Sequence, residues 1–187
     1  GKNQTIYKRL LDLIEKIACE RRTKIFNRPV RVMVDFELAF INALREFHSG
    51  MSVSCCFFHF VSNIKKRSKP IIEALKKQMG KNSLKAKAGE LIKRELMMIP
   101  LLPRDLINVE ILDMIIWRWK SSFPDHQLVF DEMRDYLVRT YIGTNATFPK
   151  ELWCVCGRVT RTNNAAESSH ATLNASVRVC GEVSLEL

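Results

Sequence analysis

The apolar residues at the start of the chain recur at spacings of three and four. This pattern, which runs from Ile6 to Ile17, predicts an amphipathic helix over Thr5–Arg21. A short alternating segment, Val30–Val34, then has the β-branched composition of a strand and ends at Asp35. The first two predicted elements are therefore a helix followed by a strand.

The same alternation continues over the next segment of the chain. Residues 37–47 have apolar positions at helical spacing, and His48-Ser49-Gly50 would end that helix. Residues 53–60 are rich in Cys, Phe and Val and predict a second strand. A helix, strand, helix, strand order favours a parallel sheet with helical crossovers, which is an α/β fold.

Beyond residue 60 the pattern changes to helical periodicity. Residues 63–141 carry four successive apolar stripes, separated at Pro100, Pro103 and Pro124. We therefore expect three parts: a partial α/β core over 1–60, a largely all-helical insertion over 61–147, and a return to the core over 148–187. The last part would contain a short strand around residues 153–155 and a final helix over 163–177.

Composition narrows the class of protein. The chain has 187 residues, of which 47% are hydrophobic, so one domain with a buried core is expected. Its longest nearly unbroken apolar run, Leu96–Leu102, contains a proline and is far shorter than a membrane span, so no membrane partner is expected. The six cysteines include two adjacent ones, which rarely bond to each other, and this favours a reduced intracellular protein.

Positive charge is concentrated in one part of the predicted insertion. The net charge is +10, and the segment from Lys65 to Arg94 has eleven basic residues against two acidic ones, a local excess of 11 − 2 = +9. A solvated helical face is one explanation, and a track for the phosphate backbone of DNA is the other. The residues of this block that we expect to contact DNA are Lys65, Lys66, Arg67, Lys69, Lys76 and Lys77.

Two groups of residues in the predicted core could carry chemistry. Asp35 would lie at the carboxyl edge of the sheet, where ligands of open α/β sheets bind, although it could instead cap the following helix. Cys56 and His59 form a C-x-x-H pair, which is half of a zinc site; Cys154 and Cys156 could complete it. The flanking phenylalanines favour simple packing of this pair over metal binding.

A third segment, Arg161–His170, reads RTNNAAESSH. A helix beginning near its two asparagines would place Glu167 and His170, three residues apart, on one face. The alternative is a capped helix whose exposed Glu167 interacts with the positive end of the helix dipole.

These segments occur in a fixed order that resembles the transposase domain of Mutator-like elements, over about residues 1–177. The blocks that carry the resemblance are Asp35-Phe36-Glu37-Leu38-Ala39, Cys56-Phe57-Phe58-His59-Phe60, Tyr141-Ile142-Gly143, Phe148-Pro149 with Trp153, and Arg161-Thr162-Asn163-Asn164-Ala165-Ala166-Glu167. The resemblance implies an RNase H-like fold that is interrupted by a helical insertion before the last catalytic helix.

The resemblance also implies a chemistry, in which three acidic residues hold two Mg²⁺ (or Mn²⁺) ions that promote DNA cleavage and strand transfer. By motif match, Asp35 is the second acid and Glu167 the third, and both would ligate Mg²⁺. Three groups would have supporting or binding roles. Cys56, His59, Asn164 and His170 would support the site, Arg161 would contact DNA, and Trp117 or Trp119 would stack on a displaced base.

The family's first acid lies on an earlier strand, so we expect the chain to be a fragment that lacks that residue and is inactive alone. The expected partners are DNA, both transposon ends and target, and a second copy of the chain, in the nucleus. Two alternatives remain: a non-catalytic DNA-binding module derived from a transposase, and a small zinc-stabilised helical domain.

Overall fold

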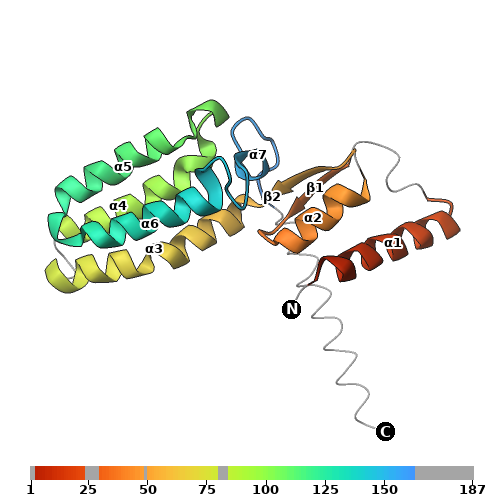
Figure 1. Cartoon of the computed structure of the whole chain (residues 1–187), viewed down its shortest axis with the longest axis horizontal. Coiled ribbons are helices and arrows are strands. Elements are labelled where there is room, and N and C mark those ends of the chain that lie inside the picture. Colours follow the sequence, from red (N-terminus) through yellow and green to blue (C-terminus); the bar gives the residue numbers. More distant parts are fainter. Residues whose placement is uncertain (1–2, 24–29, 49, 80–83, 163–187) are drawn as a thin grey trace, which may run out of the picture.

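The computed structural model describes residues 3–23, 30–48, 50–79 and 84–162. Figure 1 shows a small sheet with helices α1 and α2 beside it, and a bundle of helices on the other side. Helix α7 lies between the sheet and the bundle. Within the described residues the protein is a mixed α/β structure in which helices predominate.

The sheet has two parallel strands, β1 (Arg31–Val34) and β2 (Ser52–Cys55), with Val32 opposite Val53. Helix α2 (Leu38–Phe47) forms the crossover between them, as parallel strands require. Helix α1 (Gln4–Glu20) is capped by Asn3, whose side chain accepts a hydrogen bond from the Thr5 backbone N–H. The predicted order of helix, strand, helix and strand is confirmed.

Helix α1 packs against α2, but the face that it buries is not the apolar stripe from which the helix was predicted. Its buried residues are Leu11 and Ala18, whereas Ile6, Leu10 and Leu13 of the predicted stripe are about half exposed. Apolar periodicity predicts that a helix forms, but it does not show which element packs against it. The helix was therefore predicted correctly and its buried face was not.

The second predicted strand, residues 53–60, is wrong over its second half. Strand β2 ends at Cys55, and helix α3 (Phe57–Met79) begins two residues later and passes through residue 60. The buried residues Cys56, Phe60 and Ile64 are four apart, which is a helical spacing. The apolar residues of β2 and of the first turn of α3 form one continuous run, so composition alone could not show where the strand ends and the helix begins.

Four further helices follow in the described residues: α4 (Leu84–Met98), α5 (Val109–Ser122), α6 (Gln127–Leu137) and the short α7 (Lys150–Trp153). Short 3₁₀ segments, Ile99–Leu101, Arg104–Leu106 and Pro124–His126, separate them at the predicted prolines. Helix α3 packs on α4 and α6, and α5 packs on α6. None of these helices in the described ranges is long and apolar enough to cross a lipid bilayer.

A π-helical turn, Val138–Ile142, extends α6 and ends at Gly143. A Cβ atom added at Gly143 would lie 2.8 Å from the Val138 carbonyl oxygen, so a side chain there would force the backbone to move. The Gly143 backbone N–H donates to that same oxygen at 2.9 Å. The glycine of the Tyr141-Ile142-Gly143 block therefore has a steric explanation.

The strand predicted around residues 153–155 is wrong. Trp153 ends helix α7, and Cys154 and Val155 follow in an irregular segment. Pro149 occupies the N-cap position of this helix, and the Cys154 backbone N–H donates to the Lys150 carbonyl, which closes the helix at the residues where a strand was expected.

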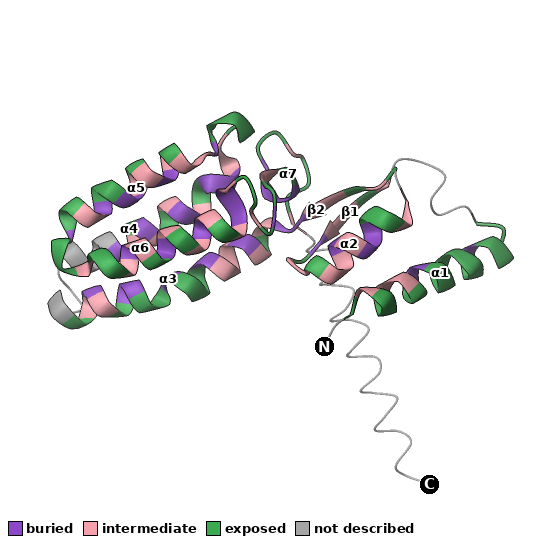
Figure 2. Cartoon of the chain, viewed as in Figure 1, coloured by how far each residue is buried: buried purple, intermediate pink, exposed green. Residues whose placement is uncertain are grey.

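Aromatic residues from distant segments form the junction between the sheet and the bundle. Phe36 contacts Tyr141 and Phe148 with ring centroids 5.5 and 5.1 Å apart, and Phe60 stacks on Trp153 at 5.2 Å. The Trp153 indole donates to the Phe148 carbonyl at 2.9 Å. Figure 2 shows buried residues continuing from the bundle through α7 to the sheet, so the two parts share this core.

Candidate functional site

Asp35 directly follows strand β1 at the carboxyl edge of the sheet. The Cys56 backbone N–H donates to the Val34 carbonyl at 2.8 Å, which extends the ladder to the last residue of β1. Helix α2 has Glu37 at its N-cap position, and the side chain of Asp35 is 57% exposed. A solvent-accessible carboxylate therefore stands at the place predicted for it.

His59 lies in the first turn of α3 and faces this carboxylate. Its Nδ1 atom is 3.1 Å from Asp35 Oδ1, and its side chain is 30% exposed. The Nδ1 atom itself is buried, and no well-aligned hydrogen bond reaches it from the described residues. The approach brings two of the predicted site residues together.

The cysteines beside His59 are buried. Cys55 and Cys56 are both fully buried, and burial raises the pKa of the Cys55 thiol to about 12. A thiol in this environment stays protonated and unreactive at neutral pH. Packing therefore accounts for Cys55, and Cys56 occupies the turn that delivers His59 to Asp35.

The segment that begins at Arg161 contacts the same carboxyl edge of the sheet through its backbone. The Phe57 N–H, at the start of α3, donates to the Arg161 carbonyl at 2.9 Å. Arg161 also donates from its Nε atom to the Arg158 carbonyl at 3.1 Å, and its side chain is exposed. The chain thus passes the start of α3 immediately before residue 163. Asn164, Glu167 and His170 lie outside the described residues.

Glu37, the other acid of the Asp-Phe-Glu block, is engaged elsewhere. The Tyr7 hydroxyl, on helix α1, donates to Glu37 Oε1 at 2.8 Å. This contact joins α1 to the turn that carries Asp35. Sequence reasoning missed Tyr7, because its position in the helical pattern looks like an ordinary apolar site.

No group of three or more His, Cys, Asp or Glu side chains that could hold a metal ion occurs in the described ranges. The zinc site that Cys154 and Cys156 would complete is therefore not formed there. Asp35 is an oxygen donor of the type that Mg²⁺ prefers, but one carboxylate does not make a magnesium site. Any further carboxylate ligand has to come from other residues.

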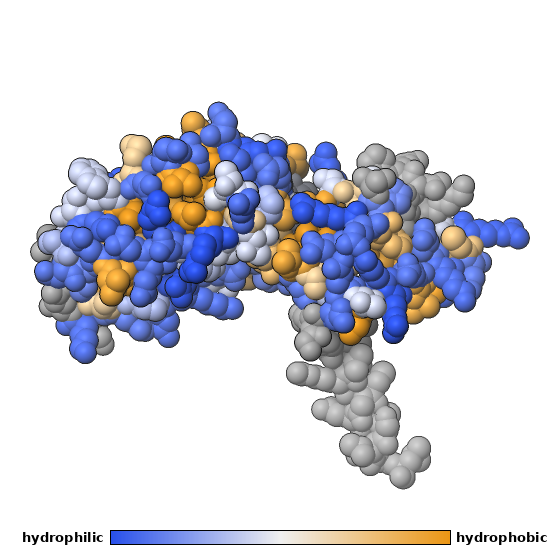
Figure 3. Space-filling view, in the orientation of Figure 1, coloured by the Kyte–Doolittle hydropathy of each residue, from blue (hydrophilic) through white to orange (hydrophobic). Residues whose placement is uncertain are grey.

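The predicted DNA-binding cations lie along α3, which leads away from Asp35. Lys65, Lys66, Arg67, Lys69 and Lys77 are exposed. Figure 3 shows hydrophilic side chains over most of the visible bundle surface, with apolar side chains gathered over part of it. One predicted cation is less accessible, because Lys76 is half-buried and lies 3.6 Å from Glu90.

The two candidate tryptophans have different environments. Trp119 is 7% exposed, and its indole N–H donates to Glu95 at 3.1 Å. Trp117 is 71% exposed and lines a cleft of about 490 Å³ between α5 and α6. Of the two, Trp117 is therefore the one whose ring is available to stack.

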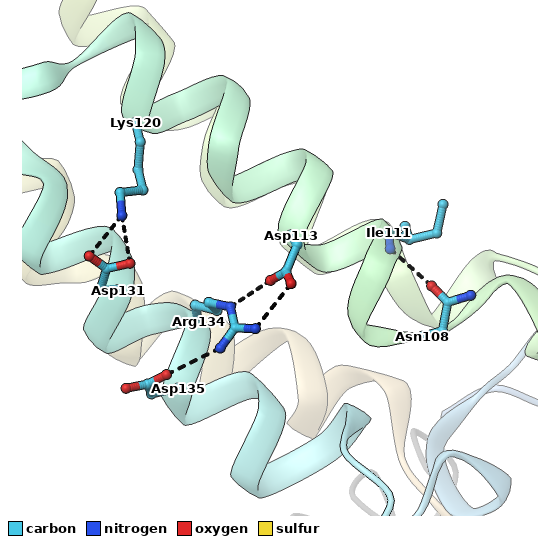
Figure 4. A network of polar contacts seen from close by, with 7 residues as sticks. All are labelled: Asn108, Ile111, Asp113, Lys120, Asp131, Arg134 and Asp135. Carbon is cyan, nitrogen blue, oxygen red and sulfur yellow. Dashed lines mark hydrogen bonds and ion pairs between the residues drawn. The ribbon is translucent and has the colours of Figure 1, made fainter.

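Two ion pairs line the same cleft (Figure 4). Lys120 lies 2.8 Å from both oxygens of Asp131, and Arg134 donates to Asp113 at 2.5 and 3.0 Å. The Arg134 guanidinium lowers the pKa of Asp113 below its ordinary value of 3.8. These cations are neutralised by their partners, so the cleft has little net charge to attract DNA.

Comparisons of the chain with protein family models, with curated proteins and with solved structures found no match.

Proposed function

We propose that the chain is the catalytic region of a DDE-type transposase with an RNase H-like fold, which resembles that of Mutator-like elements. The observation that carries the proposal is the meeting of three blocks at one sheet edge. Asp35, His59 and the backbone of Arg161 are far apart in the sequence and come together there. A shared edge is what a site built from these three blocks requires.

The aromatic junction supports the same proposal. Phe36 belongs to the Asp-Phe-Glu block, Phe60 follows the C-x-x-H pair, and Tyr141, Phe148 and Trp153 belong to the two blocks between. The aromatic residues of these sequence blocks therefore also contact one another in the structure. A common core for these four blocks explains why their aromatic residues occur together.

In this proposal Asp35 and Glu167 would hold two Mg²⁺ or Mn²⁺ ions together with a further acid. The bound ions would supply activation of water, and then of a DNA 3′-hydroxyl, for attack on a phosphodiester. His59 would orient the Asp35 carboxylate through their 3.1 Å contact. Cys56 fixes the turn that carries His59, and Asn164 and His170 would support Glu167.

The exposed cations of α3 would hold the DNA near this site. Lys65, Lys66, Arg67 and Lys69 occupy neighbouring positions of one helix that starts at the Asp35 edge. Phosphate contacts of this kind give affinity without sequence preference and depend strongly on salt. Arg161, which is exposed at the same edge, would contact the strand closest to Asp35.

The alternative is a non-catalytic DNA-binding module, for which the exposed cations of α3 would serve equally well. That module would keep the α3 cations and bind DNA without a divalent ion. The two proposals differ in whether a metal binds at Asp35.

Iron-directed cleavage of the polypeptide tests this difference. Fe²⁺ replaces Mg²⁺ at carboxylate sites and, with ascorbate and peroxide, cuts the backbone close to where it binds. We expect cuts near residues 35, 57–59 and 161–167, which excess Mg²⁺ suppresses. Asp35→Asn should abolish all of them together, and DNA binding should remain nearly unchanged.

Asp131→Asn is the matched control, because Asp131 is also a partly exposed aspartate but pairs with Lys120. This variant should keep the full cutting pattern. If Asp35→Asn also keeps it, or if wild-type protein binds DNA but is never cut near residue 35, the catalytic proposal is wrong and the non-catalytic module is favoured.

A further inference from the structure

An open cavity of about 280 Å³, lined by polar and charged residue types, lies between α3 and α6. Its lining residues are Asn63, Lys66 and Arg67 of α3 and Tyr136 of α6. The Arg67 guanidinium carbon lies 5.1 Å from the centre of the Tyr136 ring, over its face. This cation–π contact holds a planar group with several N–H donors in a fixed orientation at the cavity.

The cavity differs in charge from the cleft between α5 and α6. None of its four lining residues is acidic, and no ion pair in the described part of the chain involves Lys66 or Arg67. The cations of the other cleft are held by Asp113 and Asp131. The α3–α6 cavity therefore keeps two uncompensated positive charges for an anionic ligand.

The cavity also lies on the helix face that begins at the candidate site. His59, Asn63, Lys66 and Arg67 are separated by four, three and one positions, which places them on one side of α3. The eight helical steps from His59 to Arg67 span about 12 Å along the axis of α3. One strand of duplex DNA carries a phosphate about every 3.4 Å of its axis, so a few phosphates cover this distance.

Rigid contacts fix the cavity relative to Asp35. The Asn63 side-chain amide donates to the Tyr141 hydroxyl at 3.2 Å, and the Tyr136 and Tyr141 rings are 5.9 Å apart. Tyr141 in turn contacts Phe36, the neighbour of Asp35, edge to face at 5.5 Å. Because Tyr141 is almost fully buried, these contacts leave little freedom for the spacing to change.

We propose that this cavity is a subsite for one phosphodiester of the DNA strand, a few phosphates away from the phosphodiester that lies at Asp35. Arg67 would contact the phosphate oxygens with its oriented guanidinium, and Lys66 would add a second charge. The inference rests on the proposed function, because that function identifies the ligand as DNA. It goes further by assigning a position-holding role to Asn63 and Tyr136, which carry no charge.

Fluorescence anisotropy with a short labelled DNA duplex tests the subsite across a series of salt concentrations. Arg67→Gln should weaken binding about tenfold and reduce the salt slope by about 0.9. Tyr136→Leu, which removes no charge, should weaken binding several-fold because Arg67 loses its oriented position. Tyr136→Phe keeps the ring and should bind like the wild type.

A double-mutant cycle separates a built subsite from a diffuse cationic track. In the subsite, Tyr136→Leu has no further effect once Arg67 is Gln, whereas its full effect persists beside Lys69→Gln. Lys69 is the matched control, since it is an exposed cation of the same helix that lies near Glu73 and not at the cavity. Circular dichroism would check that every variant keeps its helical fold.

The proposal is overturned if Tyr136→Leu leaves the affinity unchanged, or if it weakens binding equally with and without Arg67. If iron does not cut the wild-type protein near residue 35 but Arg67 and Tyr136 are coupled in DNA binding, the catalytic function is contradicted and the DNA subsite is supported. If iron cuts near residue 35 but the two residues are not coupled, the subsite is contradicted and the catalytic function is supported.

Discussion

At the scale of single residues, two neighbouring phenylalanines on α3 have opposite environments. Phe60 is 1% exposed and contacts Phe36, Tyr141 and Trp153, whereas Phe58 is 52% exposed. Phe60→Ala should therefore lower the free energy of unfolding by about 3–5 kcal/mol, through lost burial and a cavity. Chemical denaturation measures this change.

Phe58→Ala is the control for that measurement, and it should alter the free energy of unfolding by no more than about 0.5 kcal/mol. Equal effects of the two substitutions would contradict the aromatic junction as the common core of sheet and bundle.

Some site residues were predictable one at a time and others were not. A polar residue after a short apolar strand is a strong signal, so Asp35 could be placed at the sheet edge from its position alone. From the sequence, His59 was interpreted as half of a possible zinc site. It lies close to Asp35 because helix α3 begins at Phe57, where the sequence pattern predicted a strand. Tyr136 has no signal, because only the packing of α6 on α3 brings it to Arg67.

At the scale of elements, α5 and α6 are joined by the two-pronged contact of Arg134 with Asp113. Arg134 lowers the pKa of Asp113 in the folded state, so the pair stabilises the fold above pH 3.8 and loses that contribution as the pH falls below it. Wild type should exceed Asp113→Asn in stability by about 0.5 kcal/mol near neutral pH, since the pair is partly exposed.

Denaturation of both proteins at a series of pH values checks this expectation. The difference between wild type and Asp113→Asn should shrink toward zero as the pH falls below 3.8. A difference that persists unchanged well below pH 3.8 would mean that the ionised pair contributes nothing to the joining of α5 and α6.

The elements could be predicted from the sequence where periodicity and breakers agreed. Prolines at positions 100, 103 and 124 separate helices in the structure as they did in the pattern. Short apolar runs were ambiguous, and the runs after Cys55 and around Trp153 both turned out helical where a strand was expected. The helix predicted over 163–177 lies outside the described residues.

At the scale of the whole molecule, the positive charge of α3 should govern the affinity for DNA. Neutralising Lys65, Lys69 and Lys77 together should weaken binding to every DNA sequence and reduce the salt slope by about 2.7. These three cations are exposed and lie outside the α3–α6 cavity. Filter binding or anisotropy at several salt concentrations measures the slope.

The matched control neutralises three exposed cations of the α1 segment, Arg9, Lys16 and Arg21. It removes the same net charge from a different surface and should change the slope much less. Equal changes in both triple variants would mean that overall charge, rather than the α3 surface, attracts DNA.

A transposase-type site requires Asp35 and Glu167 to share one divalent-ion site, and paramagnetic Mn²⁺ tests this most directly. Bound Mn²⁺ broadens nearby amide signals in nuclear magnetic resonance spectra, so broadening is expected around both residue 35 and residue 167. Asp35→Asn should then remove the broadening around residue 167, and Glu167→Gln should remove it around residue 35. Broadening at one position that survives substitution at the other would contradict a shared site.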